Sequence, residues 1–245
     1  MADRSAEPDL ASVPEEPTAL ADDLLERVRR EARTEPVERA LATLEAPALE
    51  RVREERRAGL AFWLNLYNAA TQLLLERRPG LYGSRWRFFR APAVTVAGVD
   101  LSLDDIEHGI LRGGRSKYGL GYLPRLSRTG LPAAYSLDLD PRIHFALNCG
   151  AASCPAILAY DPGSVDRVLD GATRSYLEGT VEYGPDRDRA RLPRLCLWFV
   201  GDFGGPAGLR DLLREHDQVP PGASPSLRFR SYDWSRAPRA FARGE

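Results

Sequence analysis

The sequence has few cysteines, only one lysine and no long apolar run. Three cysteines among 245 residues form a sparse and odd-numbered set, which argues against a disulfide framework. No apolar run approaches the roughly 18 residues that a membrane span requires. The first residues also lack the basic start and apolar core of a secretory signal. We therefore expect a soluble, cytoplasmic protein with no membrane-spanning segment.

The charge balance gives no sign of a polyanionic partner. The chain has 34 basic and 35 acidic residues, and Lys117 is its only lysine. The arginines are scattered along the sequence, so no broad basic field forms that would attract nucleic acid or anionic lipid. We expect neither nucleic acid nor a membrane as a partner, and the sequence leaves the oligomeric state open.

The order of segments predicts an α+β protein. Residues 1–17 are rich in Pro, Glu and Ala, which is typical of a mobile tail, and we expect one domain over residues 18–240. Apolar residues at helical spacing predict helices from about residue 19, over 36–44 and from 47 towards 57. We expect this helical N-terminal part to pack on a small, mostly antiparallel sheet.

Residues 59–77 form the most apolar segment and predict a helix that is buried on nearly all sides. Asn65, Asn68 and Gln72 lie on one stripe of this helix, at spacings of three and four. Buried amides need hydrogen-bonding partners. They either hold the backbone of neighbouring loops or, as the sharper alternative, orient a catalytic group or a substrate carbonyl.

Periodicity and turn signals predict the remaining elements. A strand with a solvated face is expected for residues 85–90, a short strand or hairpin arm for 94–99, and a long loop for 113–140. Further helices are predicted over 102–112, 155–160, 164–177 and 207–216, and further strands over 140–148, 195–200 and 227–234.

Two of the three cysteines lie directly after the predicted strand that carries His144. Cys154 precedes Pro155, a residue favoured in the first turn of a helix, so Cys154 is expected near a helix N-terminus. The unpaired amides there lower a thiol pKa and can stabilise an oxyanion. Cys154 is therefore the better candidate nucleophile and Cys149 the second. The alternative is that both are small buried residues in a tight turn.

A metal site and a redox pair are less favoured interpretations of the same residues. His144, Cys149 and Cys154 are spaced by five, whereas structural zinc usually takes paired C-x₂₋₄-C ligands and four donors. The C-x-x-C spacing of redox motifs is also absent. We therefore expect no metal and no cofactor.

The predicted helix 102–112 carries further candidates. Asp104 and Arg112 each lie one turn from His108, and they favour and oppose the imidazolium respectively. His108 is either a structural histidine or, beside Glu107, a candidate base. Arg112 and the amide of Asn148 are candidate substrate-binding groups.

The ordered motifs resemble the domain of unknown function 547 family over roughly residues 55–235. The segments that carry the resemblance are Phe-Trp-Leu-Asn-Leu-Tyr-Asn (62–68), Ile-Glu-His-Gly-Ile-Leu-Arg (106–112), Arg-Ile-His-Phe-Ala-Leu-Asn-Cys-Gly (142–150), Ser-Cys-Pro (153–155), Asp-Phe (202–203) and Tyr-Asp-Trp (232–234). The resemblance implies an α+β fold that has been likened to thiol peptidases. It also implies that relatives in plants lack the cysteines and keep the motif around His144.

Two functional hypotheses follow. In the first, the protein is a cysteine-dependent hydrolase or acyl transferase acting on an amide or ester of a small molecule or peptide. Cys154 attacks the carbonyl, His144 or His108 takes the proton, and Glu107 orients the imidazole. Asn65, Asn68, Asn148, Cys149 and Arg112 are then the expected substrate-binding residues. In the second, the chain is a non-catalytic module that binds a ligand or protein through the loop 113–140.

Overall fold

The computed structural model describes residues 12–125 and 130–242. Its α-helices are α1 (Pro17–Arg30), α2 (Glu35–Ala42), α3 (Glu50–Glu54), α4 (Arg56–Arg77), α5 (Arg85–Arg90), α6 (Gly130–Ala134), α7 (Val165–Thr180), α8 (Arg194–Trp198) and α9 (Gly205–Glu215). The shorter 3₁₀ segments are η1 (Ala46–Leu49), η2 (Pro79–Gly83), η4 (Pro141–Phe145) and η5 (Pro185–Arg187), and η3 (Asp105–Leu111) is a π-helix.

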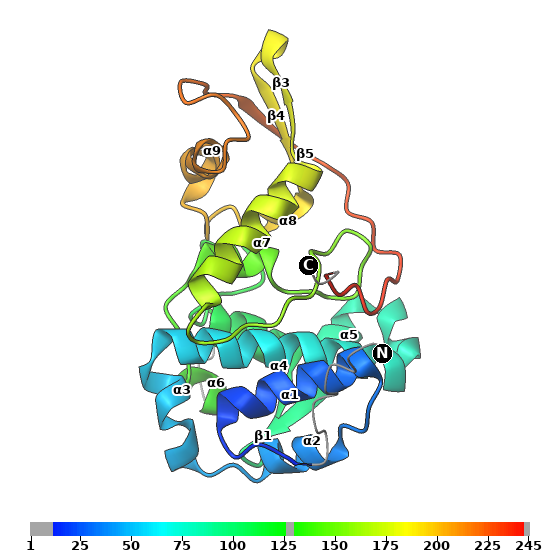
Figure 1. Cartoon of the computed structure of the whole chain (residues 1–245). Coiled ribbons are helices and arrows are strands. Elements are labelled where there is room, and N and C mark those ends of the chain that lie inside the picture. Colours follow the sequence, from blue (N-terminus) through cyan, green and yellow to red (C-terminus); the bar gives the residue numbers. More distant parts are fainter. Residues whose placement is uncertain (1–11, 126–129, 243–245) are drawn as a thin grey trace, which may run out of the picture.

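Two small sheets complete the fold, which is therefore α+β, as predicted. β1 (Pro92–Val96) and β2 (Val99–Ser102) form an antiparallel hairpin. In the second sheet, β4 (Arg189–Leu192) lies between β3 (Glu182–Gly184) and β5 (Ser226–Phe229). It pairs antiparallel with β3 and parallel with β5. Figure 1 shows α1 to α6 and the hairpin in one half of the molecule, with α7 to α9 and the second sheet in the other.

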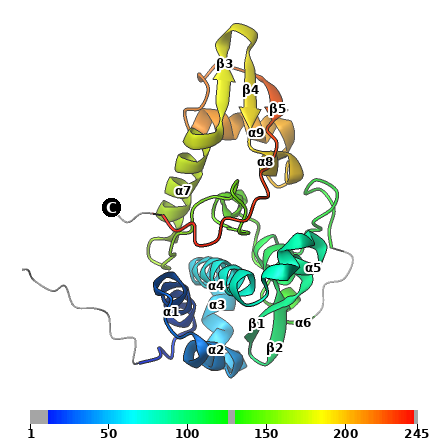
Figure 2. The same cartoon turned by 90° about the vertical axis from the view of Figure 1, so that its right-hand side faces the viewer.

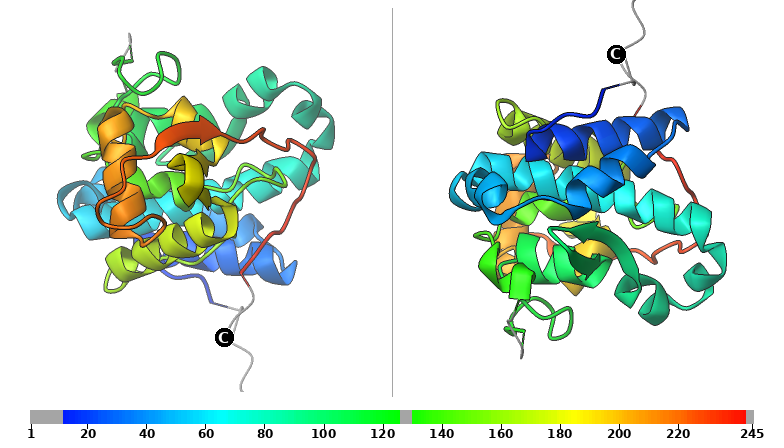
Figure 3. Two further views of the ribbon diagram at one scale, coloured as in Figure 1. Left: turned by 90° about the horizontal axis from the view of Figure 1, so that it is seen from above. Right: turned by 90° about the horizontal axis from the view of Figure 1, so that it is seen from below.

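The predicted buried helix is confirmed as α4. Every residue from Ala58 to Leu75 is buried, because α1, α3 and the β1–β2 hairpin pack around this helix. Figure 3 shows the molecule from its two ends: α9 and β5 lie in front in the view from above, and α1 and α2 lie in front in the view from below. No helix in the described part of the chain combines the length and the hydrophobicity needed to cross a bilayer.

The segment that carries His144 joins two hydrophobic clusters. Ile143 belongs to the larger cluster, which is built around α1, α4 and the hairpin, and Phe145 belongs to the smaller one around α8, α9 and β4. Both side chains are fully buried. The intervening His144 is therefore held at the junction between the two halves.

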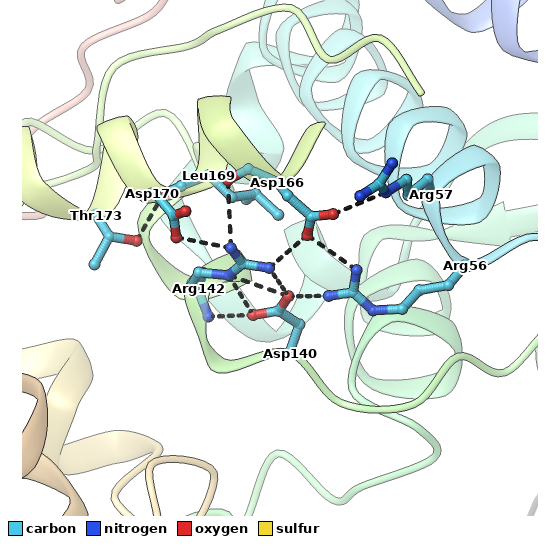
Figure 4. A network of polar contacts seen from close by, with 8 residues as sticks. All are labelled: Arg56, Arg57, Asp140, Arg142, Asp166, Leu169, Asp170 and Thr173. Carbon is cyan, nitrogen blue, oxygen red and sulfur yellow. Dashed lines mark hydrogen bonds and ion pairs between the residues drawn. The ribbon is translucent and has the colours of Figure 1, made fainter. Parts of the chain in front are cut away.

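An ion-pair network fixes this junction from the outside (Figure 4). The Arg142 guanidinium contacts Asp166 and Asp170 of α7 at 2.8 and 2.7 Å. It also contacts Asp140, which pairs with Arg56 at the start of α4. Arg56 reaches Asp166 at 3.0 Å. The network links α4, η4 and α7, so η4 keeps one orientation relative to both helices.

The prediction of a strand over residues 140–148 is wrong. The segment forms η4, because the Asp140 carboxylate accepts the Arg142 amide at 3.0 Å and Pro141 occupies the first helical position. The alternation of apolar residues is misleading, since residues 143–148 are buried on both sides. Period-two alternation predicts a strand only where one face is exposed.

The predicted helix over 155–160 is also absent. Backbone groups of this segment pair with the C-terminal segment rather than with their own next turn: Ile157 donates to Ala240 at 2.7 Å and accepts from Ala242 at 2.9 Å. Residues 231–242, which we call the C-terminal strap, also receive hydrogen bonds from Ala152 and Ser153. The strap thus provides the partners that a helix would otherwise have supplied.

Two further strand predictions are wrong. Residues 195–200 lie mainly in α8, and residues 85–90 form α5. The run 195–200 is short and apolar, and in such runs a strand and a buried helix have similar patterns. The run 85–90 mixes three arginines with three aromatic residues and has no strict alternation that would favour a strand. The helices predicted over 164–177 and 207–216 are confirmed as α7 and α9. The strand predicted over 227–234 is confirmed only in its first part, as β5.

The structure describes the start of the helix at Ser102 in full, but only parts of the predicted tail 1–17 and loop 113–140. The helix predicted from Ser102 is present, and Ser102 and Asp105 cap it reciprocally. Residues 1–11 of the predicted tail lie outside the described residues, and α1 begins at Pro17. Residues 126–129 of the predicted loop 113–140 also lie outside them, and α6 follows. A single domain over 18–240 stays a prediction.

Candidate functional site

The two thiols that the sequence singles out lie against each other. The Sγ atoms of Cys149 and Cys154 are 2.9 Å apart, and both cysteines are partly exposed and free. The Tyr232 hydroxyl lies 3.4 Å from Cys149 Sγ and 3.2 Å from Cys154 Sγ. The Cys149 amide donates to Cys154 Sγ at 3.1 Å. Cys154 Sγ is therefore within hydrogen-bonding distance of three potential donors.

The loop that carries the thiols is held from within and by the C-terminal strap. Gly150 has φ +79°, and a Cβ atom there would lie 2.4 Å from Leu75 Cδ1, so only glycine fits at this turn. The Asn148 side chain accepts the Gly150 amide at 2.8 Å and donates to the Pro155 carbonyl at 2.7 Å. Ser153 Oγ accepts the Asp233 amide at 2.8 Å. These contacts bring residues 149 and 154 together.

The shared hydrogen bonds separate the two thiols chemically. Burial raises the pKa of the Cys154 thiol, but hydrogen bonds from Cys149 and Tyr232 outweigh burial and lower it to about 7. The hydrogen bond with Cys154, followed by burial, raises the pKa of Cys149 well above its usual value. Burial and the two neighbouring thiols also raise the pKa of Tyr232. Near neutral pH, Cys154 is thus the residue that becomes a thiolate, while Cys149 and Tyr232 keep their protons.

Four of the predicted site residues line one cavity of about 350 Å³, which we call the aromatic cavity. They are Glu107, His108, His144 and Cys149. The aromatic side chains that line it are Tyr67, Trp86, Phe89, Tyr118, Trp198, Phe199, Tyr232 and Trp234. A mostly apolar cavity with a few convergent polar groups is the usual form of a small-molecule site.

Glu107 is one of two buried acids that line the aromatic cavity, with Asp104 as the other. The Tyr67 hydroxyl from α4 donates to its Oε2 at 3.1 Å. Burial raises the pKa of Glu107 to about 7, although the nearby Arg112 guanidinium and the Tyr67 hydrogen bond oppose this effect. A carboxyl group with such a pKa can give or take a proton near neutral pH.

His108 is held as a neutral imidazole. Arg112 Nη1 lies 2.9 Å from His108 Nδ1, and since a guanidinium can only donate, this ring nitrogen accepts. The proton is therefore on Nε2, which lies 3.6 Å from Asp104. Burial, followed by Arg112 and Lys117, lowers the pKa of His108 well below its usual value.

His144 forms a buried dyad with Asp202. Its Nε2 donates to Asp202 Oδ2 at 2.8 Å, which leaves Nδ1 as the accepting nitrogen. Arg112 Nε contacts the same carboxylate oxygen at 2.6 Å and is fully buried. The His144 ring stacks on Phe199 with a centroid distance of 4.2 Å. Burial lowers the pKa of His144, and the bond to Asp202 opposes this effect.

The predicted substrate-binding amides bind protein backbone instead of facing the cavity. Asn65 exchanges two 2.9 Å hydrogen bonds with the Tyr160 backbone. Asn68 donates to Ala146 at 3.1 Å and accepts from the Asn148 amide at 2.9 Å. This geometry supports the first interpretation of the amide stripe, in which the amides position the cysteine loop.

The structure departs from the predicted nucleophile–base pair in two respects. Cys154 does not lie at a helix N-terminus, so its lowered pKa comes from side-chain and amide donors. Neither His108 nor His144 forms a hydrogen bond with a cysteine sulfur among the described residues. The described residues also contain no cluster of three or more His, Cys, Asp and Glu arranged to hold a metal ion.

Sequence reasoning gave no role to Tyr232, Asp202 or Tyr67. Tyr232 and Asp202 belong to short motifs that contributed only to the family resemblance, and Tyr67 is one aromatic residue in an apolar helix. Each of them lies 40 to 90 residues from its partner in the sequence, so these pairings cannot be read from local patterns. The available signal was that each of the three lies in a motif that carries the family resemblance.

Comparison with known protein families matches residues 52–177, just over half of the chain, to the family described as protein of unknown function, DUF547. The chain belongs to this family. No curated protein and no solved structure shows a significant match. The matched range includes α4, η3 and the cysteine loop, whereas Asp202 and Tyr232 lie beyond it. Membership in the DUF547 family brings no established activity, so function has to be argued from the site.

Proposed function

We propose that this DUF547 protein is a thiol-dependent acyl-transfer enzyme, a hydrolase or an acyl transferase that acts on an amide or ester. Cys154 is its nucleophile. The observation that carries this proposal is the donor arrangement around Cys154 Sγ: the Cys149 amide at 3.1 Å, the Cys149 thiol at 2.9 Å and the Tyr232 hydroxyl at 3.2 Å. Such donors stabilise a thiolate, which is the reactive form of cysteine.

The reaction needs no strong base to start. With a pKa of about 7, a large fraction of Cys154 is ionised at neutral pH. The thiolate forms an S–C bond to the carbonyl carbon, and the C–O or C–N bond to the leaving group breaks. Tyr232, which retains its proton, donates it to the leaving group. Water or a second nucleophile then attacks the thioester, releases the acyl product and returns a proton to Tyr232.

The groups of the aromatic cavity fit the second half of this cycle. Glu107 and His144 line the same cavity as Cys149 and Tyr232, and within the described residues His144 Nδ1 forms no hydrogen bond. Either group can hold the proton of an incoming water or amine while it is passed back to Tyr232, which also lines this cavity. The aromatic side chains exclude bulk water, which strengthens electrostatic interactions inside.

The test is covalent trapping on p-nitrophenyl esters. Wild-type protein is expected to release p-nitrophenol and to show an acyl adduct on Cys154 by mass spectrometry. Cys154→Ala should lose both signals. Cys196→Ala is the matched control, because Cys196 is a fully buried thiol of α8 that does not line the aromatic cavity, and it should keep both. An adduct that survives in Cys154→Ala, or none in wild type, would overturn the proposal.

A non-catalytic binding module is the second candidate. It is favoured by one observation: among the described residues, neither imidazole is hydrogen-bonded to a thiol. In that case the aromatic cavity would bind a ligand without turnover, and Cys154→Ala would leave ligand affinity unchanged. Wild-type protein would then give no acyl adduct with any p-nitrophenyl ester tested.

A further inference from the structure

A second, larger cavity also reaches the thiol pair. It has a volume of about 1000 Å³ and is bounded by the cysteine loop, one face of α7 and the start of the C-terminal strap. In Figure 2, α7 lies on one side and the first part of the C-terminal strap, drawn in red, on the other, and the rest of the strap runs below the central loop towards α7. Cys154 lines this cavity and Cys149 lines the aromatic cavity, while Tyr232 lines both. The nucleophile of the proposed reaction therefore faces the larger cavity.

The larger cavity is strongly basic, and we call it the arginine groove after its four arginines. They come from four different parts of the fold: Arg29 from α1, Arg167 from α7, Arg194 from α8 and Arg230 from the segment after β5. Among the described residues that line the groove, Asp233 alone is acidic. The chain as a whole is nearly neutral, so this concentration of positive charge is local.

Three of these arginines have no acidic partner within the described chain. Arg29, Arg167 and Arg194 form no ion pair or side-chain hydrogen bond there, and Arg29 only stacks over the Phe241 ring at 5.9 Å. Arg230 contacts Glu182 at 3.1 Å. By contrast, many other arginines of this chain lie in ion pairs, as Arg142 does. Unpaired guanidinium groups around a concave surface attract anions and bind carboxylates through two parallel hydrogen bonds.

We propose that the arginine groove binds an acidic peptide segment and presents one of its carbonyl groups to Cys154. This inference rests on the proposed function, because a substrate of that reaction must contain an acyl carbon. A peptide with Asp or Glu side chains supplies both the carbonyl and the negative charge. A nucleic acid supplies charge on phosphodiesters, which contain no acyl carbon. The volume of about 1000 Å³ is at the upper end for small-molecule sites and suits several peptide residues.

The test measures binding separately from catalysis. Full-length Cys154→Ser protein is titrated into a rhodamine-labelled Glu-rich peptide and into its matched Gln peptide, with fluorescence anisotropy as the readout. The acidic peptide is expected to bind at least about tenfold more tightly, and raising the salt from about 50 to about 500 mM should remove most of this difference. Arg167→Ala and Arg194→Ala should each weaken its binding about five- to tenfold. Arg174→Ala is the control, since it lies on the same helix but does not line the groove.

The outcomes separate the two proposals. Equal affinity for the two peptides, no binding of either, or equal losses in Arg174→Ala and Arg167→Ala would overturn the arginine groove as an acidic-peptide site. Tighter binding of a single-stranded oligonucleotide of equal charge would overturn it as well. If the acidic peptide binds as expected but its thioester never acylates wild-type Cys154, the groove stands and the proposed enzyme function fails. If both peptide thioesters acylate Cys154 and the two peptides bind with equal affinity, the proposed enzyme function stands and the acidic-peptide site fails.

Discussion

Cys149 and Cys154 bring their sulfur atoms to 2.9 Å, and the Cys149 amide donates to Cys154 Sγ at 3.1 Å. The two thiols therefore act as a unit, in which Cys149 supplies both its thiol and its backbone amide to the sulfur of Cys154. Cys196, which is buried apart from this pair, shows the opposite result, because burial outweighs the hydrogen bond from its own backbone amide and raises its pKa. This relationship, together with Tyr232, makes the cysteine loop chemically distinct from the rest of the chain.

The first prediction concerns oxidation of this pair. Oxidised glutathione should convert the two thiols to a disulfide, with loss of two electrons and two protons as the oxidant becomes two glutathione thiols. Mass spectrometry of the digested protein should show residues 149 and 154 linked and Cys196 free. Iodoacetamide labelling of Cys154 should stop and return after dithiothreitol. Cross-links to Cys196, or persistent labelling after oxidation, would contradict the expected pairing.

The second prediction is the pH dependence of alkylation. Because the pKa of Cys154 is lowered to about 7, its iodoacetamide rate should rise with a midpoint near that pH and level off about one unit above. Tyr232→Phe and Cys149→Ala each remove a donor, so each should move the midpoint towards that of a free thiol, about 8.5. Quenching the iodoacetamide reaction at a series of times and analysing the digest by mass spectrometry gives the alkylation rate of each cysteine. An unshifted midpoint in both variants would show that these donors do not stabilise the thiolate.

The third prediction concerns the buried carboxylate that binds both His144 and Arg112. Asp202→Asn removes the negative charge between a fully buried guanidinium and an imidazole, and it should cost about 3–5 kcal/mol in the free energy of unfolding. Asp211→Asn is the matched control, since Asp211 pairs with Arg214 on the exposed side of α9 and should cost less than about 1 kcal/mol. Urea denaturation of both variants decides the matter, and similar losses would refute the structural role of Asp202.

The fourth prediction is a pH-dependent stability that depends on Glu107. Its pKa rises from 4.5 to about 7 on folding, so the native state binds more protons than the unfolded state between these values. The stability contributed by Glu107 is thus fully present below about pH 4.5 and is lost as the pH rises through 7, by up to about 3 kcal/mol. Glu107→Gln cannot ionise and should lack this loss.

Unfolding free energies at about pH 5 and about pH 8 measure the effect in wild type and variant. Taking the difference between the two proteins cancels the opposite titration of His108 and His144, which is common to both. Glu178→Gln, an exposed change on α7, should follow wild type at both pH values. If Glu107→Gln weakens with rising pH as much as wild type, Glu107 is not the titrating group.

The sequence by itself determined the longer helices, in which either one face or the whole circumference is buried. The helix α4, the capped helix after Ser102, α7 and α9 all follow from helical periodicity and capping residues. It also singled out Cys149, Cys154, His144 and His108 as candidates, because the chain has only three cysteines and three histidines, and it singled out Glu107 because it stands beside His108. Three of the wrong elements, over 140–148, 155–160 and 195–200, are short and lie near the junction of the two halves.

Tertiary structure alone decided how these groups meet. The C-terminal strap replaces the expected helix after Pro155 with backbone pairing, and it brings Tyr232 to the thiols. Asp202 meets His144 and Arg112 although 58 and 90 residues separate them. Local sequence sets which conformations a segment prefers, but the partners of a buried polar group are chosen by packing of distant segments, since each such group must be satisfied once water is excluded.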